Sequence, residues 1–143
     1  GGVECGVSHG GRRSIVGLGA RPGRPDWAIE VKGFERKTIG LVDGALAVSS
    51  AAGGGAGGHL IDPFSGDRLD RHREGAMVVG NSATECDAWA TALTVAGFEG
   101  EVARQLPVTL QGYRVNNGES TDMKPQAEAS VEEERWKRTV EIS

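Results

Sequence analysis

The longest helix signal in the sequence lies between Ser82 and Gly97, and it limits the fold more than any other feature. Ser82 and Glu85 have the S-x-x-E spacing of a capping box, in which each side chain can satisfy the other residue's free backbone N–H. Good helix formers fill residues 83–96, and Gly97 can end the helix in the left-handed conformation. A second, short helix is expected at residues 99–105. The sequence therefore predicts one main helix.

The rest of the first 115 residues consists of short apolar runs separated by glycine and proline, which is typical of strands. The expected strands are residues 14–18, 27–31, 38–42, 45–49, 59–61, 76–80 and 108–115. We expect a hairpin between the first two, across the Gly- and Pro-rich residues 19–25. We expect another between residues 38–42 and 45–49, because Asp43-Gly44 tolerates the positive φ of a type I′ turn. The predicted fold class is α+β, with a mostly antiparallel sheet.

Length and charge limit the organisation and the partners of the chain. Its 143 residues suffice for one compact domain, which we place at residues 1–115. Residues 116–143 are highly charged, so we expect a partly disordered tail in which residues 131–142 can form a helix. A net charge of −4 gives no basic surface for a phosphate backbone, and we therefore expect no nucleic-acid partner.

The sequence shows no membrane segment and leaves the compartment open. No apolar run approaches the ~20 residues that cross a bilayer, and the first residues lack the pattern of a secretory signal. The two cysteines, Cys5 and Cys86, match neither a disulfide framework nor a metal-binding pattern. Cys86 lies in the expected helix, where it is either a small buried apolar residue or a reactive thiol.

A first candidate site is the segment GGHLIDPFSG at residues 57–66, which follows a run of glycine and alanine. His59 and Asp62 lie at the two ends of a short strand that leads into a Pro-Gly turn. One interpretation is structural: Asp62 caps the turn through the backbone, and His59 is an ordinary histidine. The other is functional, with His59 acting as a general base or orienting a phosphate beside a glycine-rich loop.

A second candidate site lies on the main helix, in the segment CDAWATAL at residues 86–93. Asp87 and Thr91 are four residues apart, so they project from the same face, one turn from each other. A hard cation could be bound by this carboxylate and this hydroxyl together. Alternatively, Asp87 interacts with the helix dipole, and the Thr91 hydroxyl bonds back to a helix carbonyl.

Taken together and in this order, the two segments resemble the signature of the ApbE family of FAD:protein FMN transferases. That signature is an HxIDP-x-x-G turn followed by an ADAxATAL helix. Three upstream segments also resemble family strands: VSHGG at residues 7–11, WAI at residues 27–29 and ALAVSS at residues 45–50. The resemblance runs from the first residue through Val115 and covers the carboxy-terminal half of the family.

The resemblance implies a transferase that cleaves FAD, releases AMP and leaves FMN on a Thr or Ser hydroxyl of an acceptor protein. Such phosphoryl chemistry relies on charge neutralisation, so Mg²⁺ is the implied cofactor. By position, Asp87 and Thr91 would be its side-chain ligands, and His59 would be the catalytic residue. Ser49, Ser50, His59 and Asp62 would lie on the flavin side, with Asp62 shaping the turn.

The resemblance is incomplete, because the family's amino-terminal half has no counterpart in this sequence. That half carries most of the flavin pocket and an alanine carbonyl that is the third protein ligand of the metal. We therefore expect the isolated chain to be inactive and to associate with a complementary half or with a second copy. In addition, AAGGGAGG at residues 51–58 replaces polar and aromatic residues near the flavin. The alternatives are thus a non-catalytic flavin- or nucleotide-binding or interaction module, and a structural remnant.

Overall fold

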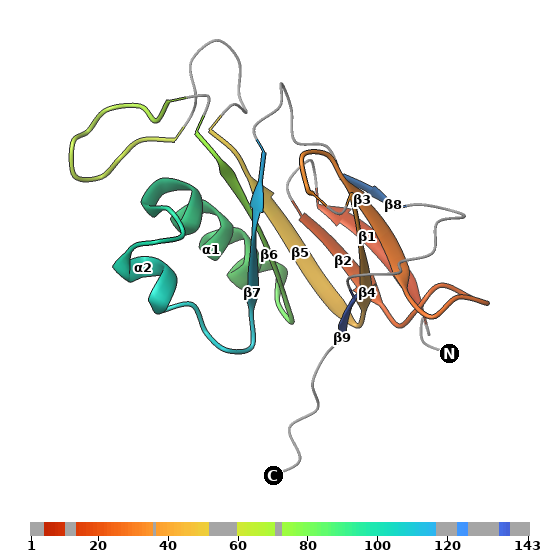
Figure 1. Cartoon of the computed structure of the whole chain (residues 1–143). Coiled ribbons are helices and arrows are strands. Elements are labelled where there is room, and N and C mark those ends of the chain that lie inside the picture. Colours follow the sequence, from red (N-terminus) through yellow and green to blue (C-terminus); the bar gives the residue numbers. More distant parts are fainter. Residues whose placement is uncertain are drawn as a thin grey trace.

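A computed structural model describes residues 5–10, 14–35, 37–51, 60–70, 73–116, 123–125 and 135–137. These residues form three layers, in which two helices cover one face of a sheet and a second sheet covers the other face (Figure 1). One main helix and mostly antiparallel strands make this an α+β fold, as the sequence predicts. His59 and the glycine-rich residues 52–58 lie outside the described residues.

The central sheet has five strands, and every neighbouring pair in it is antiparallel. Its order is β1 (Gly6–Gly10), β2 (Ser14–Leu18), β5 (Gly44–Ser49), β6 (Gly75–Gly80) and β7 (Gln111–Val115). Every residue of β5 and β6 is buried, because the helices cover one face of these strands and the second sheet covers the other. Most of the core therefore lies on the two faces of β5 and β6.

The second sheet has four strands, and two of them come from the charged tail. Its order is β8 (Met123–Pro125), β3 (Trp27–Val31), β4 (Thr38–Val42) and β9 (Arg135–Lys137). β9 runs parallel to β4, whereas the other pairs are antiparallel. The helix expected at residues 131–142 is therefore wrong where the structure describes it, because residues 135–137 extend the sheet. The boundary near residue 115 stays a prediction.

Neither hairpin expected from the sequence forms, although all four strands do. β2 pairs with β1 and β5, and β3 pairs with β4, so residues 19–26 cross from one sheet to the other. The connection at Asp43 likewise crosses between sheets, from β4 to β5. Asp43 has a φ of 51°, but Gly44 is not among the described residues with positive φ. A type I′ hairpin needs positive φ at both central residues, so this chain reversal lacks the required turn.

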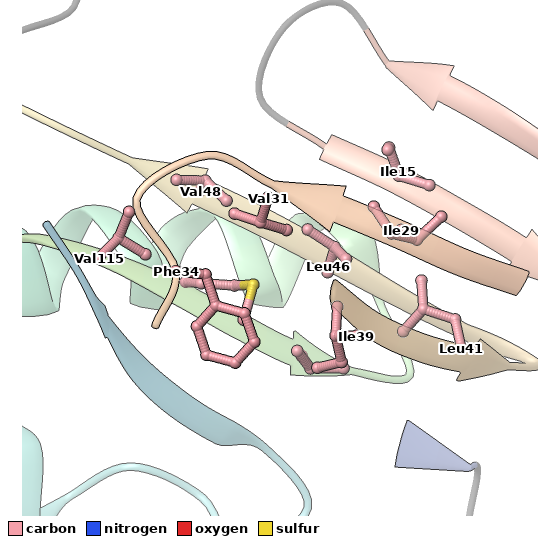
Figure 2. Packing of buried hydrophobic residues seen from close by; sticks show 11 residues of the cluster. Ile15, Ile29, Val31, Phe34, Ile39, Leu41, Leu46, Val48 and Val115 are labelled. Carbon is pink, nitrogen blue, oxygen red and sulfur yellow. The ribbon is translucent and has the colours of Figure 1, made fainter. Parts of the chain in front are cut away.

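Large apolar side chains fill the space between the two sheets. Leu46 and Val48 point from β5 toward β3 and β4, where Val31, Ile29 and Ile39 meet them (Figure 2). The whole cluster is buried and consists of Ile15, Ile29, Val31, Phe34, Ile39, Leu41, Leu46, Val48, Met77, Val79 and Val115. Burial of this apolar area is what holds the sheets together.

Helix α1 (Ala83–Ala96) begins and ends at the residues that the sequence predicts. The Ser82 hydroxyl accepts a hydrogen bond from the Glu85 N–H at 3.4 Å. Gly97 follows the helix with a φ of 85° and a ψ of 170°, so its φ is positive but its conformation is not the expected left-handed one. The second helix, α2 (Glu101–Arg104), is one turn long and lies within the expected residues 99–105. Among the described residues, neither helix is both long and apolar enough to cross a membrane.

Candidate functional site

Helix α1 lies with one face on the central sheet, and this places the candidate metal ligands on its flank. Cys86, Ala90, Leu93 and Thr94 are buried against β5 and β6. Asp87 is exposed and Thr91 is half-buried. Because the helix turns by about 100° per residue, both side chains lie on the same side of the buried face. The structure therefore brings Asp87 and Thr91 together on one flank, as the four-residue spacing predicts.

The same flank continues to Val95, another turn along the helix. Val95 packs against a small buried cluster of Ala51, Leu60 and Leu69. Leu60 is the residue that follows His59 in the sequence. The flank of α1 that carries Asp87 and Thr91 thus leads to the residue that directly follows His59 in the sequence.

Residues 60–69 form a short, hydrogen-bonded loop around the Pro-Gly turn. The Leu69 N–H donates to the Leu60 carbonyl at 2.9 Å, and Ile61 forms an isolated bridge with Arg68. The Asp62 carboxylate accepts from the Phe64 N–H at 2.8 Å, and the Asp62 carbonyl accepts from the Gly66 N–H at 2.8 Å. Asp62 therefore caps this turn, as the structural interpretation of the sequence proposes.

Ser49 and Ser50 lie at the end of β5 and are buried. The Ser49 carbonyl accepts a hydrogen bond from the Thr94 hydroxyl at 3.3 Å, and that hydroxyl also lies 2.8 Å from the Ala90 carbonyl. Ser49 is therefore level with the last turn of α1. Asp87 lies nearer the first turn of the helix. The thiol of the neighbouring Cys86 is 3.7 Å from the Ala45 carbonyl, which lies toward the other end of β5. The two serines and Asp87 are thus at opposite ends of the helix, about 10 Å apart along its axis.

Thr94 and Arg73 are two residues that the sequence interpretation missed. Thr94 is completely buried and links α1 to β5, and the Arg73 guanidinium donates to the Thr94 carbonyl at 3.0 Å. Together they hold the end of α1 against the sheet. The sequence did contain a signal for Thr94, because this threonine lies on the same helix face as the apolar residues Cys86, Ala90 and Leu93. A hydroxyl buried on such a face requires a hydrogen-bond partner.

Cys86 is buried, and its environment disfavours the reactive thiolate. Burial, with a smaller contribution from the Glu85 carboxylate, raises the pKa of its thiol from the usual 9.0 to about 12. The thiol is therefore protonated at neutral pH, whereas the nucleophile would be the thiolate. Of the two interpretations of Cys86, the small buried apolar residue fits this environment.

The side chains on the flank suit a hard cation only in part. A carboxylate and a hydroxyl are the oxygen donors that Mg²⁺ prefers, and the exposure of Asp87 leaves room for the waters that this ion keeps. In the part of the chain that the structure describes, no three His, Cys, Asp or Glu side chains gather in a way that could hold a metal. Asp87 and Thr91 therefore fit two positions of a magnesium site, and the remaining protein donors would have to come from elsewhere.

Comparison with known proteins agrees with this fold. The structure is similar to the crystal structure of the apo form of the flavinyl transferase ApbE from Pseudomonas stutzeri, with a TM-score of 0.60 and 20% sequence identity. The similar region covers 88% of this chain and 42% of that one, so this chain spans less than half of the solved protein. No curated protein matches the sequence. The sequence pattern of the ApbE family matches residues 2–111, about three quarters of the chain, and the protein therefore belongs to the ApbE family.

Proposed function

We propose that this chain is the carboxy-terminal part of an FAD:protein FMN transferase. Together with the rest of such a fold, it would transfer FMN from FAD to a Thr or Ser hydroxyl of an acceptor protein, with Mg²⁺ as cofactor. The observation that carries the proposal is the flank of α1, on which Asp87 and Thr91 lie one turn apart and Val95 packs against the cluster of Ala51, Leu60 and Leu69. Because the chain belongs to the ApbE family, we interpret Asp87 and Thr91 on this flank as metal ligands of a flavin transferase.

In the proposed reaction, the bond between the two phosphates of FAD breaks and a phosphoester forms with the acceptor oxygen. AMP leaves, and the proton of the acceptor hydroxyl passes to a base. His59 is the candidate base, because imidazole titrates near neutral pH and can take up this proton. Asp87 and Thr91 would hold the cation. Bound Mg²⁺ would neutralise the charge that the pyrophosphate carries.

The remaining residues of the loop and of β5 would support the site. The hydrogen-bonded turn at Asp62 fixes the conformation of residues 62–67, which follow His59 in the sequence. Ser49 and Ser50 would lie on the flavin side, at the end of the strand that Thr94 ties to α1. The solved relative is more than twice as long as the region it shares with this chain. We therefore expect no transfer by the isolated chain, and transfer only when an amino-terminal half is present.

The test is the substitution Asp87→Asn in the complete protein, with transfer of FMN to a Thr-containing acceptor measured by flavin fluorescence and by mass. We expect loss of Mg²⁺-dependent transfer by at least about 100-fold, because the amide removes the charged ligand. The free energy of unfolding should change by less than about 0.5 kcal/mol, since Asp87 is exposed.

Glu85→Gln is the matched control, because Glu85 is also exposed but lies two residues away, about 200° around the same helix. Transfer at the normal rate by the Asp87→Asn protein would show that this flank is not the metal site. Saturable binding of FAD and Mg²⁺ without any transfer by the complete protein would instead support the non-catalytic binding module.

A further inference from the structure

Both edges of the second sheet are closed by strands from the charged tail. The two inner strands, β3 and β4, precede residue 116, whereas β8 beside β3 and β9 beside β4 belong to residues 116–143 (Figure 1). A sheet of β3 and β4 alone would have two open edges. An open edge is a template for pairing with another chain, and the tail occupies both of these edges.

The sequences of β3 and β4 would make these open edges prone to association. Strand β4 has the sequence TIGLV, without a charged residue or a proline, and Ile39, Gly40 and Leu41 are buried. Strand β3 has the sequence WAIEV, in which Glu30 is the single charged residue. Apolar strands with unpaired backbone groups are the ones that associate edge to edge. Each of these two strands therefore requires a partner at its outer side.

The backbone of β8 closes the edge of β3 and also ends the sheet there. The Val31 N–H donates to the Lys37 carbonyl at 2.8 Å, toward β4. The two groups of one peptide unit point in opposite directions, so the Glu30 carbonyl points toward β8, where Lys124 is its partner. Pro125 follows Lys124, so the N–H that proline lacks would point away from β3. A further strand would find no donor at this position.

Strand β9 closes the edge of β4 in a similar way. The Lys37 carbonyl points toward β3, so residue 38 and every second residue after it turn their N–H toward β9. Gly40 and Val42 are two of these residues. In the parallel register Trp136 lies between them, so its own N–H and carbonyl meet β4. The two flanking residues of β9 are basic, and charged residues on an edge strand discourage further pairing.

We propose that the charged tail is an edge guard, which keeps the second sheet from pairing with a second copy of the chain. On each side, a three-residue strand satisfies donors and acceptors of the inner strand and leaves proline or basic residues at the new edge. Glu30 and Lys124 also place opposite charges directly across the pair, which stabilises it. Removal of both tail strands should therefore turn the second sheet into an association surface. The proposal does not depend on flavin transfer.

The test places proline at the two tail residues whose N–H groups face the sheet, as Lys124→Pro with Trp136→Pro in the full chain, without flavin or Mg²⁺. Hydrogen exchange followed by NMR reports the pairing. The Glu30 and Val42 amides, which face the tail, should exchange at least about tenfold faster, while the Val31 amide keeps its protection. In sedimentation velocity, the association constant should rise at least about tenfold above that of the unmodified chain.

The matched control is Met123→Pro with Lys137→Pro, which places the same residue one position away. There the lost N–H points to the outer edge, so exchange and sedimentation should match those of the unmodified chain. Glu30 and Val42 amides that exchange equally fast in the unmodified chain and in the first proline variant would overturn the proposal. So would loss of their protection without stronger association.

A milder variant keeps the test decisive if the prolines also unfold β3 and β4, which faster exchange of the Val31 amide would reveal. Lys124→Glu places like charges opposite Glu30, so the Glu30 amide should exchange about two- to fivefold faster, and association should strengthen with it. Glu30→Lys combined with Lys124→Glu restores opposite charges and should reverse both effects. Unchanged exchange or association in the Lys124→Glu chain, or no recovery in the charge-swapped chain, would contradict the edge guard.

Discussion

The two faces of the central sheet carry side chains of different size. Toward α1, strands β5 and β6 present small side chains, which are Ala45, Ala47, Ala76 and Val78. Toward the second sheet, the same two strands present large ones, which are Leu46, Val48, Met77 and Val79. Both faces are completely buried. The difference shows that the degree of burial alone does not decide the size of the side chain on each face.

The two faces also differ in polarity. Between the sheets, large apolar side chains surround Leu46, and a hydrogen bond joins the sheets at their margin, from the Trp27 indole N–H to the Leu18 carbonyl at 3.1 Å. On the helix face, the Thr94 hydroxyl and the Cys86 thiol reach the carbonyls of Ser49 and Ala45 on β5. Small strand residues let the helix come close enough for these contacts. The flank with Asp87 and Thr91 is therefore positioned by a contact that includes two buried polar groups, whereas the second sheet is held mainly by large apolar side chains.

The largest effect should come from removing volume between the sheets. Leu46→Ala deletes a completely buried side chain, and we expect the free energy of unfolding to fall by about 2 to 5 kcal/mol. Urea unfolding followed by circular dichroism measures this loss. Leu18→Ala is the control, because Leu18 lies on β2 of the same sheet and is 46% exposed. Equal losses in the two variants would contradict the assignment of this face as the main core.

Adding volume on the helix face should have the next largest effect. Ala47→Leu places a large side chain under α1, and overpacking should lower the free energy of unfolding by about 1 to 3 kcal/mol. It should also displace the helix, so Mg²⁺-dependent transfer by the complete protein should fall. Ala96→Leu, at an exposed position of α1, is the control. An Ala47→Leu protein as stable as the unmodified one would show that the helix face tolerates larger residues.

High pH should weaken the helix face through Cys86. The unfolded thiol loses its proton near the usual pKa of 9.0, whereas the folded thiol keeps it up to about 12. Stability from this group is therefore complete below pH 9 and is lost between pH 9 and 12, by up to about 1.4 kcal/mol per pH unit. Denaturant unfolding at several pH values should show this slope. Cys86→Ala should remove it, and an unchanged slope in that variant would assign it to other groups.

The smallest effect should come from the polar contact of Thr94. Thr94→Val keeps the shape of the side chain but removes its hydroxyl, and we expect a loss of about 1 kcal/mol. Thermal unfolding measures the change. Thr84→Val, at an exposed position of the same helix, should lose clearly less. If both substitutions lower the unfolding temperature equally, the hydrogen bond between Thr94 and Ser49 does not stabilise the protein.

Local features of the candidate site could be predicted from the sequence. The spacing of Asp87 and Thr91 predicts a shared helix flank, because helix geometry alone sets it. The turn at Asp62 likewise follows from an Asp-Pro sequence that ends in glycine. The packing of Val95 on the cluster that contains Leu60 and the contact of Thr94 with Ser49 could not be predicted, because they join residues far apart in the sequence.

The sequence by itself determined the helix with its caps, the positions of most strands and the order of the family segments. These features depend on neighbouring residues, whose hydrogen bonds and apolar periodicity act over a few positions. Only the tertiary structure decided which strands pair. Asp43-Gly44 is compatible with a hairpin, yet β4 and β5 belong to different sheets. The physical reason is that large side chains on one face of β5 and small ones on the other are both buried only when separate layers cover them.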